Sequence, residues 1–268
     1  MPHAQKTGTA WDRRKEDYAY TRELDRPGWA WEFLRRNEEF RRDCRMNRAG
    51  QPKAIQHVSG AALYRPRRRF LAAEAWGLEL FADPNKTALE VDVFWFSNLK
   101  SNTVQCNCRQ SNGNESHALS LDMFHGRRGI LIGAVAEHIV VCGPRCSASM
   151  VIGSGTLLFG KANVAFIHNG LTTSSRHYQT TRILTKLTSK SANNNRRVPQ
   201  KDSKLLEYLI ALDGRLAGLS YREIAIILYG RKTVETTWSD DTRGYKSKVI
   251  RACKGGFKLM DRGYFALL

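Results

Sequence analysis

Cationic side chains near the C-terminus recur at a spacing that gathers them on one side of a helix. The set comprises Arg243, Lys246, Lys248, Arg251, Lys254 and Lys258. At about 100° per residue, four of them fall within one quadrant, and Lys246 and Lys248 lie on its flanks. Tyr245, Val249 and Cys253 face the other way and predict an apolar anchor. Lys and Arg presented in this way can bind the phosphates and guanine edges of duplex DNA.

We expect residues 242–260 to form this helix and to contact DNA. The expected principal contacts are Arg243, Arg251 and Lys254, and the expected supporting contacts are Lys246, Lys248, Lys258 and Arg222. The alternative is a surface helix whose lysines are simply solvated. Gly244 and the pair Gly255 and Gly256 each disfavour a helix by about 1 kcal/mol relative to alanine, so they are candidates for its ends.

Two further helices must position the cationic one. Residues 201–217 carry leucine and isoleucine on one broad face, and a glycine follows. Ser220 and Glu223 then form a capping box that opens a short helix, which Gly230 ends. This order is typical of the first two helices of a helix-turn-helix. The connection after Gly230 is longer than the usual three or four residues, and we expect its Trp238 to plug the core.

An aromatic-rich segment near the N-terminus is also predicted to be helical. Its large side chains are Trp29, Trp31, Phe33, Leu34 and Phe40. A Pro-Gly pair precedes them, and Asn37 can cap a second helix that begins at Glu38. These side chains form either a docking face for another domain or partner, or an ordinary small core.

The remaining segments complete an α+β organisation of four parts. We predict a mostly helical, aromatic-rich domain over residues 1–96 and a linker over residues 97–118, which are polar and without periodicity. Residues 119–192 alternate apolar and polar positions between turn residues, and predict a small antiparallel meander followed by a basic helix. Residues 193–268 form the helix-turn-helix variant with a long second turn.

The overall charge favours a polyanionic partner. The 268 residues carry 43 Lys and Arg against 25 Asp and Glu, a net charge of +18. No acidic residue occurs between Glu137 and Asp202, or between Asp241 and Asp261, and such stretches attract nucleic acid. Hydrophobic residues make up 42%, which excludes a wholly disordered chain. No segment is apolar enough to span a bilayer, and no secretory signal is visible, so we expect a cytoplasmic protein with reduced cysteines.

The sequence offers no apparatus for catalysis, a cofactor or a metal. Residues 155–162 fit G-x-x-x-x-G-K, but alanine stands where a nucleotide-binding loop needs a hydroxyl. Cys106, Cys108, His117, Cys142 and Cys146 lack the C-x-x-C spacing of zinc sites. No nucleophile-elbow, H-E-x-x-H or paired-carboxylate motif appears. We therefore expect a protein that is not an enzyme and that binds no cofactor or metal.

Two sequence stretches resemble a known family. The run LIALDGRLAGLSYREIAIILYG, continued through Trp238 to KVIRACKGGFKLMDRGYFALL, resembles the C-terminal domain of proteobacterial proteins found on integrative and conjugative elements. WAWEFLRRNEEFRRD resembles the small domain that precedes it in longer members. Together they are similar to FseA-type transcriptional activators over residues 11–96 and 119–268. The chain departs from the family in having Asn37-Glu38 where Asn-Pro is frequent, and residues 97–118 match no family pattern.

The resemblance implies an extended-turn helix-turn-helix and an activator of genes for excision and transfer of a mobile element. It also implies that the aromatic N-terminal domain packs against the C-terminal domain or against a related small antiactivator domain. Promoter DNA is the expected partner, with RNA polymerase engaged indirectly. The second hypothesis is an adaptor or antiactivator that binds a homologous regulator and not DNA. A domain used only for protein contact should have a neutral or acidic final helix, so the basic helix favours DNA binding.

Overall fold

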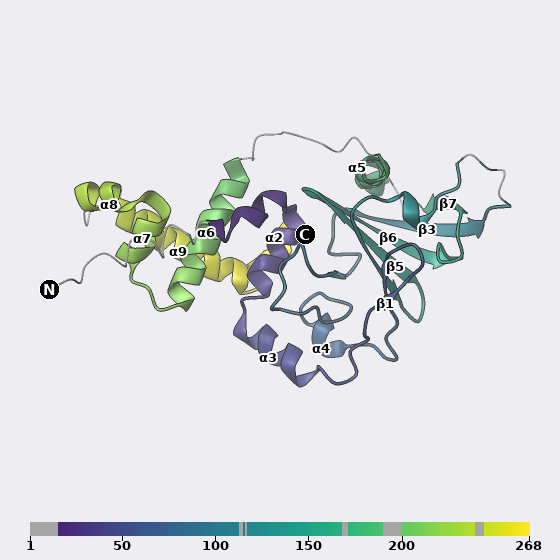
Figure 1. Cartoon of the computed structure of the whole chain (residues 1–268), viewed down its shortest axis with the longest axis horizontal. Helices are drawn as coiled ribbons and strands as arrows, with labels where there is room; N and C mark the ends of the chain where they lie inside the picture. Colours follow the sequence, from purple (N-terminus) through teal and green to yellow (C-terminus); the bar gives the residue numbers. More distant parts are fainter. Residues whose placement is uncertain (1–15, 113–114, 116, 168–170, 190–199, 239–243) are drawn as a thin grey trace.

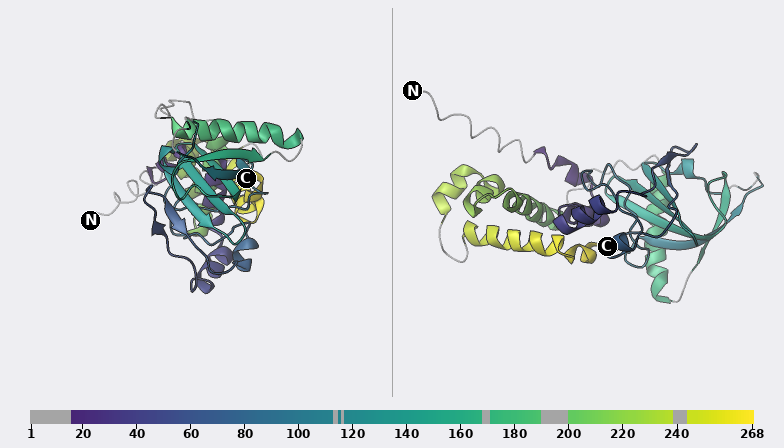
Figure 2. Two further views of the ribbon diagram at one scale, coloured as in Figure 1. Left: turned by 90° about the vertical axis from the view of Figure 1, so that its right-hand side faces the viewer. Right: turned by 90° about the horizontal axis from the view of Figure 1, so that it is seen from below.

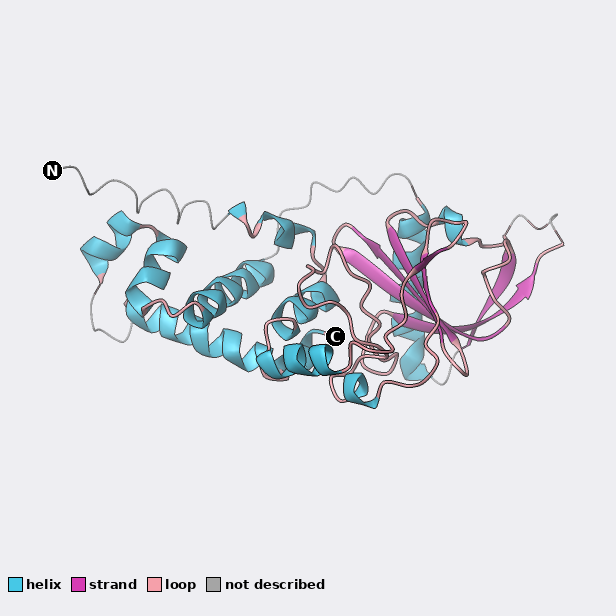
Figure 3. Cartoon of the chain, turned by 60° about the horizontal axis from the view of Figure 1, so that its bottom comes forward, coloured by secondary structure: helices cyan, strands magenta, loops and turns pink. Residues whose placement is uncertain are grey.

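The chain forms an elongated molecule with a helical end and a sheet end (Figures 1 and 3). This computed structural model describes residues 16–112, 115, 117–167, 171–189, 200–238 and 244–268. Within these ranges helices and one sheet segregate into different regions, which confirms the α+β class. Among the described helices, none combines the length and the hydropathy of a membrane-spanning segment.

Side-chain caps open both N-terminal helices: the cap at Asn37 is the predicted one, whereas Pro27 and Gly28, expected to precede the first helix, lie inside it. After the 3-10 helix η1 (Ala19–Glu23), α2 (Arg26–Leu34) is capped by Asp25, whose carboxylate accepts a hydrogen bond from the backbone N–H of Gly28 at 3.0 Å. The helix α3 (Glu38–Met46) begins at Asn37, whose side chain accepts from the backbone of Phe40 at 3.1 Å. Each cap satisfies a backbone donor that the helix itself leaves unpaired.

The sheet has seven strands in the order β1-β2-β4-β5-β6-β3-β7. Its strands are β1 (Ile55–Gln56), β2 (Ala62–Tyr64), β3 (Thr103–Gln110), β4 (Arg127–Ile132), β5 (Glu137–Gly143), β6 (Cys146–Ser154) and β7 (Ala162–Ile167). β4, β5 and β6 form the predicted antiparallel meander. However, β2 pairs with β4 and β3 pairs with β6 in parallel, so the sheet is larger and mixed.

The predicted linker over residues 97–118 was wrong, because β3 lies inside it and fills the position between β6 and β7. Val104, Cys106 and Cys108 are buried at alternate positions of this strand. Polar residues between them hid the two-residue period. The prediction of a mostly helical region up to residue 96 was also wrong in part, since β1 and β2 join the sheet and only α4 (Leu71–Glu74) is helical within residues 47–96.

The predicted basic helix after the sheet is α5 (Leu171–Thr188). It lies across one face of the sheet in Figure 2, and contacts β3, β5 and β6. Leu184 and Leu187 are its buried anchors in the sheet core. Together with the short η2 (Leu121–Met123), this helix belongs to the sheet end of the molecule.

The C-terminal region contains α6 (Gln200–Leu216), α7 (Tyr221–Tyr229), α8 (Arg231–Thr237), α9 (Tyr245–Met260) and η3 (Gly263–Leu267). The predicted capping box of α7 is present, with Ser220 and Glu223 bonded reciprocally. α6, α7 and α9 contact one another pairwise, whereas α8 contacts α7. The long second turn is therefore partly helical. Trp238, which follows α8, packs half-buried against the core of these helices, where the sequence placed it.

The two glycines at 255 and 256 do not end the last helix, because they lie where α9 crosses α6. A β-carbon on Gly255 would stand 2.6 Å from the ring of Tyr208, and one on Gly256 would stand 2.6 Å from the backbone oxygen of Tyr208. Larger residues would force the two helices apart. The glycines thus permit the close packing that extends α9 to Met260 (Figure 2).

We predict that Gly256→Ala destabilises the fold by about 1–3 kcal/mol, since the added methyl group has no room against α6. Helix propensity alone predicts the opposite sign, a gain of about 1 kcal/mol. Lys254→Ala on the exposed side of the same helix is the control, and should change stability by less than about 0.5 kcal/mol. Urea unfolding monitored by circular dichroism measures both; a stabilised Gly256→Ala would contradict the packing.

Candidate nucleic-acid interface

The outer face of α9 is cationic and its inner face is apolar. Val249 and Cys253 are buried against α6 and α7, and Tyr245 is half-buried, with its ring centroid 4.7 Å from that of Tyr229. The opposite side of the helix exposes Lys248, Arg251, Lys254 and Lys258. The anchoring pattern expected from the sequence is therefore the one that the structure has.

Several of these cations lack an ionic partner. Among the described residues, no carboxylate lies within salt-bridge distance of Arg251, Lys254 or Lys258. The ammonium of Lys248 stands over the ring of Tyr245, 4.8 Å from its centroid. Lys246 is half-buried on the flank, and Arg243 lies outside the described residues. Unpaired charges on one face can approach phosphates without first losing a partner.

A groove continues this face onto α6. It has a volume of about 440 Å³ and is lined by Lys204, Glu207, Tyr208, Tyr229, Lys248, Arg251 and Ala252. Lys204 is exposed, and its ammonium lies 5.6 Å from the ring centroid of Tyr208. Three cations from α6 and α9 thus converge beside two tyrosines. Lys204 was not among the predicted contacts, because the leucine and isoleucine face of its helix indicates only a supporting role.

Arg222 projects from the first turn of α7 and is exposed. α8 adds exposed Arg231 and Lys232, although Arg231 is near Glu235 at 3.7 Å. Val234 is the buried residue that holds α8 on the helical core. The structure therefore places all of the described candidate contacts on the same three-helix unit and on α8 attached to it.

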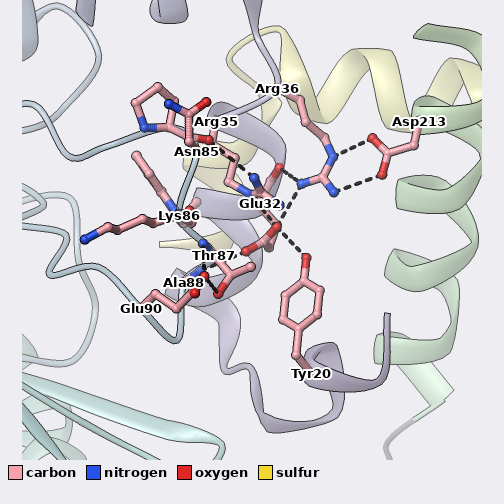
Figure 4. Close-up of polar contacts among 12 residues, drawn as sticks. Tyr20, Glu32, Arg35, Arg36, Asn85, Lys86, Thr87, Ala88, Glu90 and Asp213 are labelled. Carbon is pink, nitrogen blue, oxygen red and sulfur yellow. Dashed lines mark hydrogen bonds and ion pairs between the residues drawn. The ribbon is translucent and has the colours of Figure 1, made fainter. Parts of the chain in front are cut away.

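An ion-pair network joins this unit to the N-terminal helices (Figure 4). The Arg36 guanidinium contacts Asp213 of α6 through two hydrogen bonds, of 2.5 and 2.9 Å, and contacts Glu32 at 2.8 Å. Glu32 is fully buried and also accepts from Arg35 at 2.6 Å and from the backbone of Ala88 at 2.8 Å. A buried carboxylate is tolerated because its charge and lone pairs are all matched.

Two tyrosines complete the network. Tyr18 donates to Asp213 at 2.6 Å, and Tyr20 donates to Glu32 at 2.7 Å. Burial, followed by the neighbouring Glu32 charge, raises the pKa of Tyr20 to about 12. Burial and Asp213 raise the pKa of Tyr18 further still. Both phenols therefore remain hydrogen-bond donors at neutral pH.

Arg145 forms a second connection, from the sheet to α6. It occupies the turn between β5 and β6 with a positive φ of 57°, which is uncommon for a residue other than glycine. Its guanidinium donates to the backbone oxygen of Arg22 and to Asp202 of α6, both at 2.9 Å. Its backbone N–H donates to the backbone oxygen of Glu23 at 2.9 Å. One side chain thus ties together the sheet, η1 and the start of α6.

The aromatic residues of α2 and α3 lie inside the molecule. Trp29, Trp31, Phe33, Leu34 and Phe40 are each at most 1% exposed. They share one core with Leu209 and Leu212 of α6 and with Tyr264, Leu267 and Leu268 at the end of the chain. The interpretation as a contact between N- and C-terminal regions fits this packing. Their use as an open face for a separate partner does not, because no surface remains.

The cysteines considered as metal ligands have structural positions. Cys106 and Cys108 lie on β3, while Cys142 and Cys146 flank the turn between β5 and β6. Within the part of the chain that the structure describes, no group of three or more His, Cys, Asp and Glu side chains could hold a metal ion. Burial raises the pKa of the Cys142 and Cys146 thiols.

We predict that Tyr20→Phe changes the response of stability to alkaline pH. The pKa of Tyr20 is about 12 in the folded protein and about 10 in the unfolded chain, so the protonated phenol stabilises the fold. This contribution is fully present below about pH 10 and is lost as the pH rises through about 12. The difference in unfolding free energy between wild type and variant should therefore shrink across this window. Tyr178→Phe, at an exposed tyrosine, is the control. If the unfolding free energies of wild type and Tyr20→Phe depended on pH in the same way, the proposed contribution of Tyr20 would be refuted.

Two family matches bear on this arrangement. Residues 167–268 match the family described as "T6SS, Transcription factor, DNA binding domain", and residues 11–79 match the "Proteobacterial transcriptional regulator-like domain". The first match contains α6 to α9 and also α5, which packs on the sheet. No curated protein matches the chain. Together the two matches support the assignment of the chain as a DNA-binding transcriptional regulator.

Proposed function

We propose that this protein is a sequence-specific transcriptional activator that reads duplex DNA through α9. The observation that carries the proposal is the outward cationic face of α9, opposite its buried anchor, on which Arg251, Lys254 and Lys258 have no salt bridge among the described residues. Arg251 and Lys254 make the main contacts, with Arg243 in the segment before the helix. Lys246, Lys248, Lys258 and Arg222 support them. Such a helix can enter a major groove and present guanidinium and ammonium groups to bases and phosphates.

We further propose that its targets are excision and transfer genes of an integrative and conjugative element, as in FseA-type activators. The support is the combination in one chain of the two matched domains, which is the order that the sequence resemblance implies. The protein acts by binding and not by catalysis. It recruits RNA polymerase indirectly. A reporter driven by the DNA upstream of neighbouring genes should rise when the protein is expressed; an unchanged or repressed reporter would contradict activation.

The second candidate function is that of an adaptor, because the description of the N-terminal family, unlike that of the C-terminal one, does not mention DNA binding. An antiactivator domain docking on the N-terminal region would need a surface other than the buried aromatic cluster of α2 and α3. An adaptor has no need of the unpaired cations on α9. DNA binding with a sequence preference distinguishes the two functions directly.

We predict that Arg251→Glu with Lys254→Glu weakens binding to upstream duplex DNA by at least about tenfold and lowers the salt slope by about 2. Both positions are exposed, so folding should be unaffected. The matched control is Arg109→Glu with Lys161→Glu, an equal charge change on exposed residues of the sheet end. Gel-shift titrations at two salt concentrations measure both variants. A folded α9 variant with wild-type affinity and salt slope would disprove the assignment.

We predict a smaller loss for Lys204→Ala, of roughly threefold, because one phosphate contact in the groove is removed and α9 is left intact. The salt slope should fall by about 1. Ser203→Ala, at the exposed neighbouring position on α6, serves as the control. If Lys204→Ala and Ser203→Ala bind DNA equally well, the groove takes no part in the interface.

A further inference from the structure

A second basic site lies at the sheet end, and parallel strand pairing explains how it forms. β2 and β4 run in the same direction, so the segments that follow them leave the same edge of the sheet. Residues 65–69, with the sequence RPRRR, follow β2, and the turn over residues 133–136 follows β4. Between them is a concavity of about 580 Å³ lined by both segments and by Glu74, Glu79 and Phe96.

The arginines of this concavity are largely unpaired. Arg69 contacts Glu74 at 2.6 Å, and the other acidic group, Glu79, contacts the buried His138 at 2.6 Å. Arg65, Arg67 and Arg68 are exposed, and among the described residues none of the three has a salt bridge or hydrogen bond. The two carboxylates are thus occupied, whereas three guanidinium groups are free to bind an anion.

The surroundings strengthen the positive charge. Between Asp43 and Glu74 the sequence has seven Lys and Arg and no Asp or Glu. All seven side chains are exposed. Arg68 lies over the backbone of Gly50, with its guanidinium 3.7 Å from the position of a β-carbon there, so it joins the arginine loop to the segment after α3. The arginine loop therefore adjoins the basic segment that follows α3.

Most of the positive excess lies outside the helical unit that carries α9. Residues 200–268 hold thirteen Lys and Arg against eight Asp and Glu, a net +5 of the chain's +18. A helix in the major groove uses only part of this charge. The arginine loop follows β2 of the sheet, whereas α9 runs along the helical end (Figure 1). A duplex long enough to follow the molecule could contact both.

We propose that Arg65, Arg67 and Arg68 form a second DNA-contact surface, which binds the backbone of the duplex flanking the α9 site. This inference rests on the proposed function. Free guanidinium groups match phosphate oxygens with two parallel hydrogen bonds. The proline at position 66 restricts the loop and lowers the entropy lost on binding. Contacts to the backbone add affinity and fix orientation without adding sequence preference. An acidic protein segment is the competing occupant.

The test compares a short duplex of about 14 base pairs centred on the footprint with a long one of about 40 base pairs, since one helical turn spans about 10.5 base pairs. The variant is Arg65→Glu, Arg67→Glu and Arg68→Glu. We expect this variant to bind the short duplex with the affinity of the wild type. It should bind the long duplex at least about tenfold more weakly than the wild type does, with a salt slope lower by about 3 than that of the wild type. Its footprint should shorten on one side.

The control reverses the same number of charges elsewhere, with Arg109→Glu on β3, Lys161→Glu just before β7 and Arg182→Glu on α5, all at exposed positions. Equal losses in both triple variants would show a general charge effect and overturn the proposal. The proposal is also overturned if the arginine variant binds the long duplex with the affinity of the wild type. If that variant in addition fails to bind a labelled acidic peptide that the wild type binds, the arginines bind an acidic protein segment and not DNA. If wild type binds neither duplex, the proposed function itself fails.

Discussion

The structure depends on one shared aromatic core. The ring systems of α2 and α3 would be a small, marginal cluster by themselves, but α6 and the last residues of the chain pack into the same core. Tyr264 donates to the backbone of Trp76 at 3.1 Å, and Arg26 donates to Ala266 at 2.7 Å. Segments more than 180 residues apart in sequence are therefore parts of one packed unit. Burying large rings stabilises such a unit far more than surface ion pairs do.

This core determines how the cationic helix is presented. α9 is anchored on one side by α6 and α7, and at its end by η3 within the aromatic core. The polar contacts at Asp213 and Asp202 then fix α6 against α2 and against the sheet. Since all of these contacts lie on inner surfaces, the outer face of α9 is left for a partner. The helix α9, which we propose to contact DNA, is therefore packed against both the helical unit and the aromatic core.

The sequence was sufficient for elements with local signals. The caps at Asn37 and Ser220, the stops at Gly218 and Gly230 and the two-faced α9 follow from short-range spacing, and the structure has them. Elements fixed by long-range pairing could not be predicted in the same way. β3 is polar on one side and carries cysteines on the other, and it forms a strand because its backbone pairs with β6 and β7. Gly255 and Gly256 disfavour a helix locally but are required by Tyr208 on α6. The groove at Lys204 and the ion pairs of Asp213 and Arg145 could not be predicted either, because each depends on contacts between segments far apart in sequence.

Hydrogen exchange of the full chain tests the shared core most directly. Amides of α2, of α6 near Leu209 and of α9 with η3 should open with one common free energy, because they belong to one cooperative unit. Asp213→Ala should accelerate exchange in all three regions together. If α6 and α9 exchanged faster while α2 kept its wild-type protection, the helical end would be an independent module and the account would be wrong.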